Sequence, residues 1–475
     1  MKESRFAIWK RRLDLSADDL PIALTFIALT AIACITPPQT DTFFHLRAGQ
    51  SIWQSGSIPT TELYSHTFPG RPWLNHEWLS QLLFYGLHVG GGPLLLTIVC
   101  AACAVIAVIA SWRLTRGAAD IRLILLLSLL ILTPSEWAVR PQALSLALLM
   151  LTMWLVIRKK IGWLPLFMVA WANAHGVVLL GVVIAGANAF EALIWTRRDF
   201  PRAAIVAVLC AAAPMVSPLG LEYWPRVAQT VGEARLLAIH EYRSAFADVS
   251  SAPFWITFAV LVVATVLRLR QISQWDRSDR LLVITSGIIG VAAMMSIRNA
   301  PSFALLAAPA LSRLVQESSR QRRRMPLGDT GYRLIVVATT IALAVVGFKW
   351  RDGGAGLGWQ PVSPAALNAM RNCTGPIYNE YTDGGTLMWF LPEHPVFVDG
   401  RLEAYPPEFL LRVKRTDLMG QYRELFSEYR VHCAVTHPGS ILAQALSSDG
   451  AMHLQFSDER WAVFVGAPRL EAAAR

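Results

Sequence analysis

Charged residues are scarce in this chain of 475 residues. Aspartate, glutamate, lysine and arginine make up 16% of it, whereas 54% of the residues are hydrophobic. Soluble domains carry about 25% charged residues, so this composition excludes a water-soluble globule. Apolar runs such as 20–35, 93–112 and 333–350 approach the ~20 residues that a helix needs to cross a bilayer. The sequence therefore predicts a polytopic membrane protein.

Cysteine is also rare, with six residues in the chain. Cys373 and Cys433 lie in the C-terminal region and can pair if that region faces an oxidising compartment. Their spacing does not itself indicate a disulfide. The other four lie in apolar runs, where cysteine acts as a small packing residue: Cys34, Cys100, Cys103 and Cys210.

The basic excess gives a formal net charge of +10, but its placement argues against a nucleic-acid partner. Lysine and arginine cluster between every second pair of apolar runs, for example at 10–12, 158–160 and 320–324. This is the positive-inside pattern of membrane topology. Residues 351–475 hold 14 acidic and 11 basic residues and so are slightly negative. We therefore expect no nucleic-acid binding.

The apolar runs predict an all-α membrane bundle of about eleven transmembrane helices with the N-terminus in the cytoplasm. The expected domains are a cytoplasmic N-terminus (1–19), the bundle (20–350) with a first external loop (38–92), and a periplasmic α/β domain (351–475). Within that loop, 78–88 has helical amphipathic spacing and is expected along the membrane surface. The predicted spans are 20–37, 93–112, 121–135, 142–157, 161–173, 177–195, 203–218, 254–270, 281–297, 301–316 and 333–350.

The C-terminal domain alternates short apolar runs with helical patterns, which predicts an α/β fold. The expected strands are 376–381, 395–398, 432–436 and 461–465, and the expected helices are 407–419, 421–429 and 441–447.

Polar residues gather at the predicted outer ends of the spans, where desolvation makes idle polar groups costly. A sugar transfer from a lipid phosphate needs a carboxylate base for the acceptor hydroxyl and cations for the leaving phosphate. The predicted catalytic residues are Asp41, His45, His76 and Glu77. The predicted substrate-binding residues are Arg47, Arg140, Asn173, His175, Glu241 and Arg298.

A series of distinct motifs lies along most of the chain. They read DTFFHLRAGQSIWQSGSIPTTELYSHTFPGRPWLNHEWLSQLLF in the first loop, then RPQALSL, WANAHGVVLLG, SPLG, IRNAPSFAL and finally NEYTDGGTLMWFLPEHPVFVDGRLEAY. The sequence resembles a bacterial family of polytopic proteins with the GT-C glycosyltransferase fold. Relatives of that family include protein O-mannosyltransferases, aminoarabinose transferase and oligosaccharyltransferases. They use polyprenyl- or dolichyl-phosphate-linked donors and an acid in the first external loop.

By this resemblance, Asp41 is the acid that follows the first span and Glu77 is a looser match to a second acid. No adjacent pair of acids follows the first span, which leaves a requirement for a divalent metal, Mg²⁺ or Mn²⁺, undecided. The implied function is an integral glycosyltransferase of the bacterial inner membrane. It would move a sugar from a polyprenyl-phosphate donor to a glycan, lipid or protein acceptor on the outer face. The alternatives are a lipid or polysaccharide transporter or flippase, and a non-catalytic assembly protein.

Simpler roles stand beside these assignments. Asp41 can cap the helix that follows it, and Arg140 can pair with Glu136. Asn173 and His175 can cap short spans. In the C-terminal domain, Asp399 and Arg401 are read as a local pair in a turn, with a ligand loop as the alternative.

Overall fold

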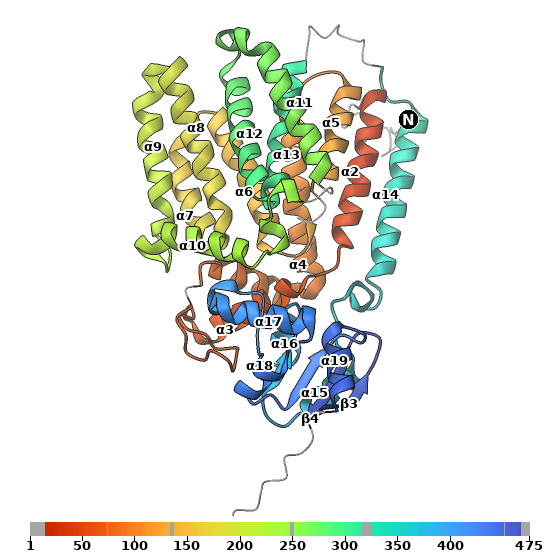
Figure 1. Ribbon diagram of the computed structural model, residues 1–475. Coiled ribbons are helices and arrows are strands. Elements are labelled where there is room, and N and C mark those ends of the chain that lie inside the picture. The colour runs from red at the N-terminus through yellow and green to blue at the C-terminus, as the bar shows by residue number, and fades with distance from the viewer. Residues whose placement is uncertain are drawn as a thin grey trace, which may run out of the picture. The chain divides into compact units, whose positions relative to one another are not determined.

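The computed structural model of the protein describes residues 15–73, 75–133, 137–247, 251–315, 325–450 and 452–466 (Figure 1). The chain forms two compact units. We call Met1–Pro37, Pro93–Gly220 and His240–Leu357 the bundle unit, and Pro38–Gly92, Leu221–Ile239 and Gly358–Arg475 the loop–tail unit. These units differ from the domains expected from the sequence, because the first loop belongs to the same unit as the C-terminal region. The predicted N-terminal segment 1–19 lies largely outside the described residues.

The bundle unit is helical, and a helix occupies each of the eleven predicted spans. Its first and last helices, α2 and α14, pack side by side through Ile27, Tyr332 and Ile335 (Figure 1). The helices are α2 (Leu20–Cys34), the second half of α4 (Trp78–Leu114), α5 (Ala119–Ile131), α6 (Pro141–Ile157), α7 (Leu164–Ala174), α8 (Leu179–Trp195), α9 (Phe200–Ala212), α11 (Ala252–Arg268), α12 (Arg277–Met295), α13 (Ala300–Val315) and α14 (Asp329–Lys349).

Fewer than eleven helices have the dimensions of a full span. Among the described residues, six are long and apolar enough to cross a membrane, or seven if the bent pair Arg197–Met215 and Gly220–Leu236 forms one span. Pro141–Ile157 and Ile161–Ala174 are apolar but short. The predicted count of eleven transmembrane helices is thus not confirmed, because an apolar run in the sequence does not fix the length of the helix that it forms.

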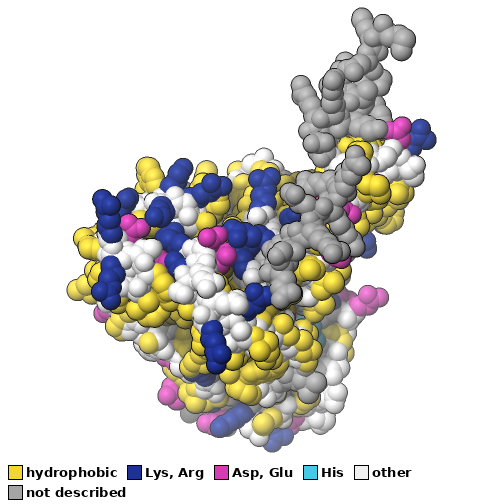
Figure 2. Space-filling model, turned by 90° about the horizontal axis from the view of Figure 1, so that it is seen from above, with side chains coloured by type: hydrophobic (Ala, Val, Ile, Leu, Met, Phe, Trp, Pro, Cys, Tyr) yellow, Lys and Arg dark blue, Asp and Glu magenta, His cyan; other side chains and the backbone are white. Residues whose placement is uncertain are grey.

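Basic residues gather at one end of the bundle unit. Arg158–Lys160 follow α6 and Arg197–Arg198 follow α8, and these side chains are exposed. Figure 2, which views the molecule from above, shows lysine and arginine side chains across this face. Arg140 immediately precedes α6 and His175 lies before α8, so these residues occupy the opposite helix ends. The bundle therefore has one basic end and one end that carries the predicted polar residues.

The loop–tail unit is built on a four-stranded sheet with the order β1-β2-β4-β3. β1 (Ile377–Asn379) and β2 (Cys433–Thr436) are parallel, whereas β4 (Ala462–Gly466) runs antiparallel to β2 and to β3 (Met452–Ser457). The associated helices are α15 (Pro364–Arg371), α16 (Gly384–Phe390), α17 (Pro407–Met419), α18 (Arg423–Glu428) and α19 (Ile441–Asp449). The α/β prediction for this region agrees with these elements.

Three details differ from the prediction. The segment 395–398 makes an isolated parallel bridge through Val396 to Ser65 of the first loop rather than joining the sheet. The strand β3 was not predicted, because its side chains are mostly exposed and leave no apolar run. The segment between the predicted spans 203–218 and 254–270 contains a further helix, α10 (Tyr223–Leu236), whose mixed polar sequence hides it from a search for apolar spans.

The first loop is folded into the loop–tail unit by two close helix contacts. α3 (Thr40–Ser55) packs on α16, and a Cβ atom at Gly385 would lie 2.4 Å from the carbonyl oxygen of Thr40. α3 also packs on the first half of α4, where a Cβ atom at Gly49 would lie 2.1 Å from the Gln81 carbonyl oxygen. Only glycine permits these approaches. They fix α3 between the C-terminal region and α4.

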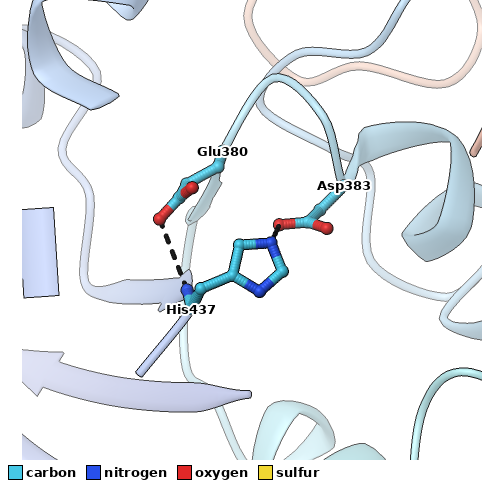
Figure 3. Close-up of side chains that lie close together, drawn as sticks. All are labelled: Glu380, Asp383 and His437. Atoms are coloured by element: carbon cyan, nitrogen blue, oxygen red, sulfur yellow. Dashed lines mark hydrogen bonds and ion pairs between the residues drawn. The ribbon is translucent and has the colours of Figure 1, made fainter. Parts of the chain in front are cut away.

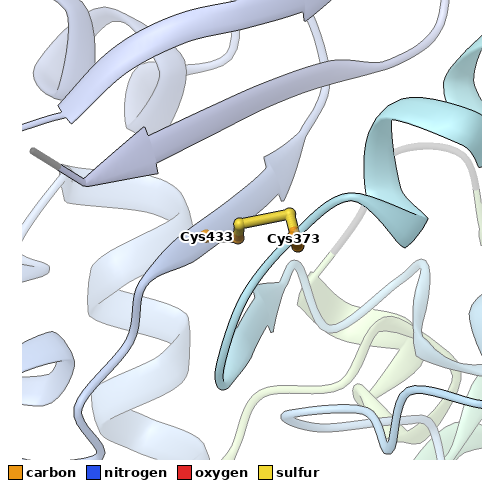
Figure 4. The surroundings of a disulfide bond; sticks show 2 residues. All are labelled: Cys373 and Cys433. Carbon is orange, nitrogen blue, oxygen red and sulfur yellow. A yellow bond between two sulfur atoms is a disulfide. The ribbon is translucent and has the colours of Figure 1, made fainter. Parts of the chain in front are cut away.

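Cys373 and Cys433 form a disulfide, with their Cα atoms 6.0 Å apart (Figure 4). The bond joins the segment after α15 to the first residue of β2. The four remaining cysteines are free, and two of them, Cys100 and Cys210, are buried. The sequence permitted this pairing but gave no reason to prefer it, since residues distant in sequence meet only through the sheet.

Candidate active site

The loop–tail unit brings together three of the four predicted catalytic residues. His45 is on α3, and His76 and Glu77 immediately precede α4. The Nε2 atom of His45 lies 3.9 Å from Glu77 Oε2, and that of His76 lies 3.9 Å from Glu77 Oε1. His45 and Gly49 are one helical turn apart, so the close contact at Gly49 helps to position His45 beside Glu77. His45 is buried, whereas His76 and Glu77 are partly accessible.

Glu403 is a fourth member of this cluster that the sequence analysis missed. It lies in a short 3₁₀ helix, η14 (Leu402–Ala404), and its Oε1 atom is 3.7 Å from His76 Nδ1. Glu403 lies in the last of the motifs found in the sequence. Nothing in the linear sequence relates that motif to His76. The cluster thus combines two imidazoles and two carboxylates from the first loop and the C-terminal region.

Asp41 lies in the first turn of α3 rather than at its N-cap, which is Gln39. This position weakens the alternative in which Asp41 is simply a capping residue, although an acid in a first turn is still favoured by the helix dipole. Asp41 is half-buried, and its Oδ1 atom lies 3.0 Å from the point where a Cβ atom at Gly400 would be. Arg47, a predicted substrate-binding residue, hydrogen-bonds Gln50 on the same helix at 2.7 Å.

The bundle unit brings together a second group of predicted residues at its less basic end. Arg298 donates a hydrogen bond from Nη2 to His175 Nε2 at 3.0 Å. His175 Nε2 is therefore the acceptor, because a guanidinium can only donate. His175 Nδ1–H then donates to Ser145 Oγ at 2.7 Å, and Trp171 Nε1–H donates to the same oxygen at 2.8 Å. This series of hydrogen bonds is formed by a neutral His175 beside Arg298. Arg298 also donates to the hydroxyl of Tyr242 and lies over its ring.

Arg140 belongs to the same group because it binds Glu241, the residue before Tyr242. Its Nη1 atom donates to Glu241 Oε1 at 2.8 Å. The two arginines, which come from distant parts of the sequence, are therefore bound by consecutive residues of the 3₁₀ helix η8 (His240–Tyr242). Glu136, the partner suggested from the sequence, lies outside the described residues. Asn173 donates to the carbonyls of Val169 and Val216 at 2.8 and 2.9 Å, as the capping alternative expects.

Asp399 and Arg401 pair locally, as the turn interpretation expected, but they are fully buried. Arg401 contacts Asp399 Oδ2 at 2.5 Å and Glu62 Oε2 at 2.9 Å, and Tyr405 donates to Asp399 at 2.6 Å. Burial alone would lower the pKa of Arg401, but the two carboxylates raise it well above its ordinary value. Arg401 also lies over the ring of Trp73. This network ties the first loop to the C-terminal region.

A further group of metal-binding residue types lies outside the predicted site. Glu380, Asp383 and His437 each place one ligand atom within 4.8 Å of the others. The sequence analysis singled out none of these three residues as a metal ligand. The hydrogen bond to Asp383 raises the pKa of His437 to about 9 despite its partial burial.

Comparison with solved structures identifies the architecture. The chain is similar to the oligosaccharyltransferase AglB of Archaeoglobus fulgidus, solved with an inhibitory peptide and a dolichol-phosphate, at 11% identity and a TM-score of 0.51. The match covers 88% of this chain and 69% of AglB. The chain is also similar to ArnT of Cupriavidus metallidurans, solved with undecaprenyl phosphate, at 14% identity and a TM-score of 0.50, over 94% of this chain and 97% of ArnT.

The fold is that of the GT-C glycosyltransferases. The resemblance noted in the sequence is thereby confirmed for the architecture of the chain. No family model and no curated protein sequence matches it. A shared fold at this level of identity does not specify the donor or the acceptor.

Proposed function

We propose that this protein is a membrane glycosyltransferase that moves a sugar from a polyprenyl-phosphate donor to an acceptor on the outer face of the bacterial inner membrane. The GT-C fold over most of the chain is the observation that carries the proposal. Both solved relatives hold a lipid phosphate, undecaprenyl phosphate in ArnT and dolichol-phosphate in AglB. The acceptor is a glycan, a lipid or a protein.

Asp41 is the general base in this proposal. A carboxylate removes the proton from the acceptor hydroxyl as that oxygen attacks the anomeric carbon and the carrier phosphate leaves. His45, His76 and Glu77 shape the surroundings of the reaction, and the close contacts of both imidazoles with the Glu77 carboxyl group support this role. A requirement for Mg²⁺ or Mn²⁺ is not part of the proposed step.

Arg298 and Arg140 bind the carrier phosphate. A guanidinium offers five N–H donors, enough to hold a protein group and a phosphate oxygen together. His175, fixed by Ser145, orients Arg298, and Glu241 orients Arg140. Arg47 and Asn173 are secondary candidates for substrate contact. Each already has hydrogen-bond partners within its own unit.

Two features support the proposed orientation in the membrane. The basic end of the bundle unit faces the cytoplasm by the positive-inside rule. The Cys373–Cys433 disulfide supports an extracytoplasmic location for the loop–tail unit, because such bonds persist in oxidising compartments.

Binding of undecaprenyl phosphate to the purified full-length protein tests the phosphate role. We expect Arg298→Ala to weaken this binding by about tenfold or more, which corresponds to ~1.4 kcal/mol. Arg298→Lys keeps the charge but loses the forked geometry of the guanidinium. Its affinity for undecaprenyl phosphate should therefore lie between those of the wild type and Arg298→Ala. Arg270→Ala removes an exposed arginine near the C-terminal end of α11 and serves as the control. Unchanged affinity in a folded Arg298→Ala protein contradicts the proposal.

A further inference from the structure

Glu380, Asp383 and His437 meet at one edge of the C-terminal sheet (Figure 3). Glu380 directly follows β1, and His437 directly follows β2. Because β1 and β2 are parallel, their carboxyl ends lie at the same edge. Asp383 precedes α16 and so reaches the group from a third element. Three residues from separate elements therefore converge on one point.

This edge carries buried negative charge. Glu380 is 9% exposed and Asp383 is 2% exposed. The carboxyl group of Asp417 lies near both and is partly buried, with hydrogen bonds from Tyr378 and Tyr381. In the part of the chain that the structure describes, no lysine or arginine forms an ion pair with Glu380, Asp383 or Asp417. Buried carboxylates are costly unless a cation offsets them.

The side chain of His437 is held as a metal-binding imidazole is usually held. Its Nδ1 atom lies 3.0 Å from the Arg460 carbonyl oxygen, and its Nε2 atom lies 3.1 Å from Asp383 Oδ2 (Figure 3). A backbone carbonyl that binds one ring nitrogen fixes the tautomer and directs the other nitrogen toward the metal. The Trp461 ring stacks on this imidazole.

Glu380 is positioned by β2 and the residue after it. Its Oε1 atom accepts hydrogen bonds from the Thr436 hydroxyl and from the backbone N–H of His437 at 3.3 Å. The His437 side chain is 38% exposed, so an ion from solvent can reach the group. The site is thus ordered by the protein yet open on one side.

We propose that Glu380, Asp383 and His437 bind a divalent transition-metal ion. One imidazole and two carboxylates are ligands that suit Zn²⁺ and Mn²⁺, with water completing the coordination. The ion would take the place of the proton between His437 and Asp383, and that proton would be released to solvent. It would join the ends of β1 and β2 to the start of α16. This proposal does not depend on the proposed transferase activity.

Metal binding by the purified full-length protein tests this site. The protein is stripped with EDTA, titrated with ZnCl₂ and with MnCl₂, and analysed for bound metal and for thermal unfolding. We expect one of the two ions to bind at a stoichiometry of about one and to raise the unfolding temperature. We expect His437→Gln and Asp383→Asn each to weaken that binding by at least about tenfold.

Matched controls come from the same unit. His453→Gln and Glu459→Gln replace exposed residues of β3 and the following turn and should bind metal as the wild type does. An intact Cys373–Cys433 disulfide, measured by mass spectrometry, and an unchanged melting temperature in EDTA show that each variant is folded. If Asp383→Asn does not fold, His437→Gln decides the matter. Failure of both ions to bind the wild type overturns the site, as does equal binding by folded His437→Gln.

Discussion

Two groups in the loop–tail unit each contain a pair of buried carboxylates, and they differ in the cation that accompanies them. Glu62 and Asp399 share the guanidinium of Arg401. Glu380 and Asp383 have the imidazole of His437 beside them, and Asp417 adds a third acid nearby. The first group is complete within the protein and is closed to solvent. The second has excess negative charge and an accessible histidine, which is what distinguishes a ligand site from a structural network.

The largest expected effect tests the complete group. Arg401→Met leaves Glu62 and Asp399 buried without their cation, so we expect a loss of roughly 3–5 kcal/mol of stability in the loop–tail unit. Thermal unfolding and limited proteolysis of the full-length protein measure this loss. Adding Glu62→Gln to the variant should recover part of it.

An exposed ion pair provides the control for that experiment. Arg423 pairs with Asp449 at the surface, and its side chain is 78% exposed. We expect Arg423→Ala to change the unfolding temperature much less than Arg401→Met does, because solvent screens an exposed ion pair. Similar losses for Arg401→Met and Arg423→Ala would show that the buried network contributes no more than a surface pair.

A smaller, pH-dependent effect tests the incomplete group. Burial raises the pKa of Asp417 to about 7, with Glu380 and Asp383 adding to the shift. The folded protein then retains a proton that the unfolded chain releases above its ordinary pKa of 3.8. This contribution to stability is present below pH 3.8 and is lost as the pH rises through about 7.

Asp417→Asn removes that titration. In EDTA, its melting temperature relative to wild type should therefore rise between pH 4.5 and pH 8, by about a few degrees. Tyr378 and the backbone of Tyr381 can still hydrogen-bond the amide. A difference from wild type that does not vary with pH would mean that Asp417 is ionised throughout this range.

The sequence predicted most of the helices, because apolar runs and helical periodicity are local properties. It also indicated the polar residues at the helix ends opposite the basic end, and four of these, Arg140, His175, Glu241 and Arg298, lie together through η8. Arginine away from the basic end was an informative signal because it departs from the positive-inside rule. The role of these residues in binding substrate stays a prediction.

The missed residues depend on contacts between distant segments. Glu403 meets His76 only because the first loop folds with the C-terminal region. His437 and Glu380 become neighbours only through the parallel pairing of β1 and β2. Strand pairing and loop docking set these contacts, and neither leaves a periodic pattern in the sequence. For the same reason, the sequence allowed a disulfide between Cys373 and Cys433 but could not assign it.

Transfer by Asp41→Asn tests the central claim most directly. Membranes that contain the wild type or the variant are incubated with a panel of radiolabelled polyprenyl-phosphate sugars, and label in acceptor material is measured. Asp120→Asn, at an exposed acid in the first turn of α5, is the matched control. We predict transfer from one donor by the wild type and the control, and a loss of at least about 100-fold in Asp41→Asn with normal membrane insertion. Undiminished transfer by Asp41→Asn would contradict the account.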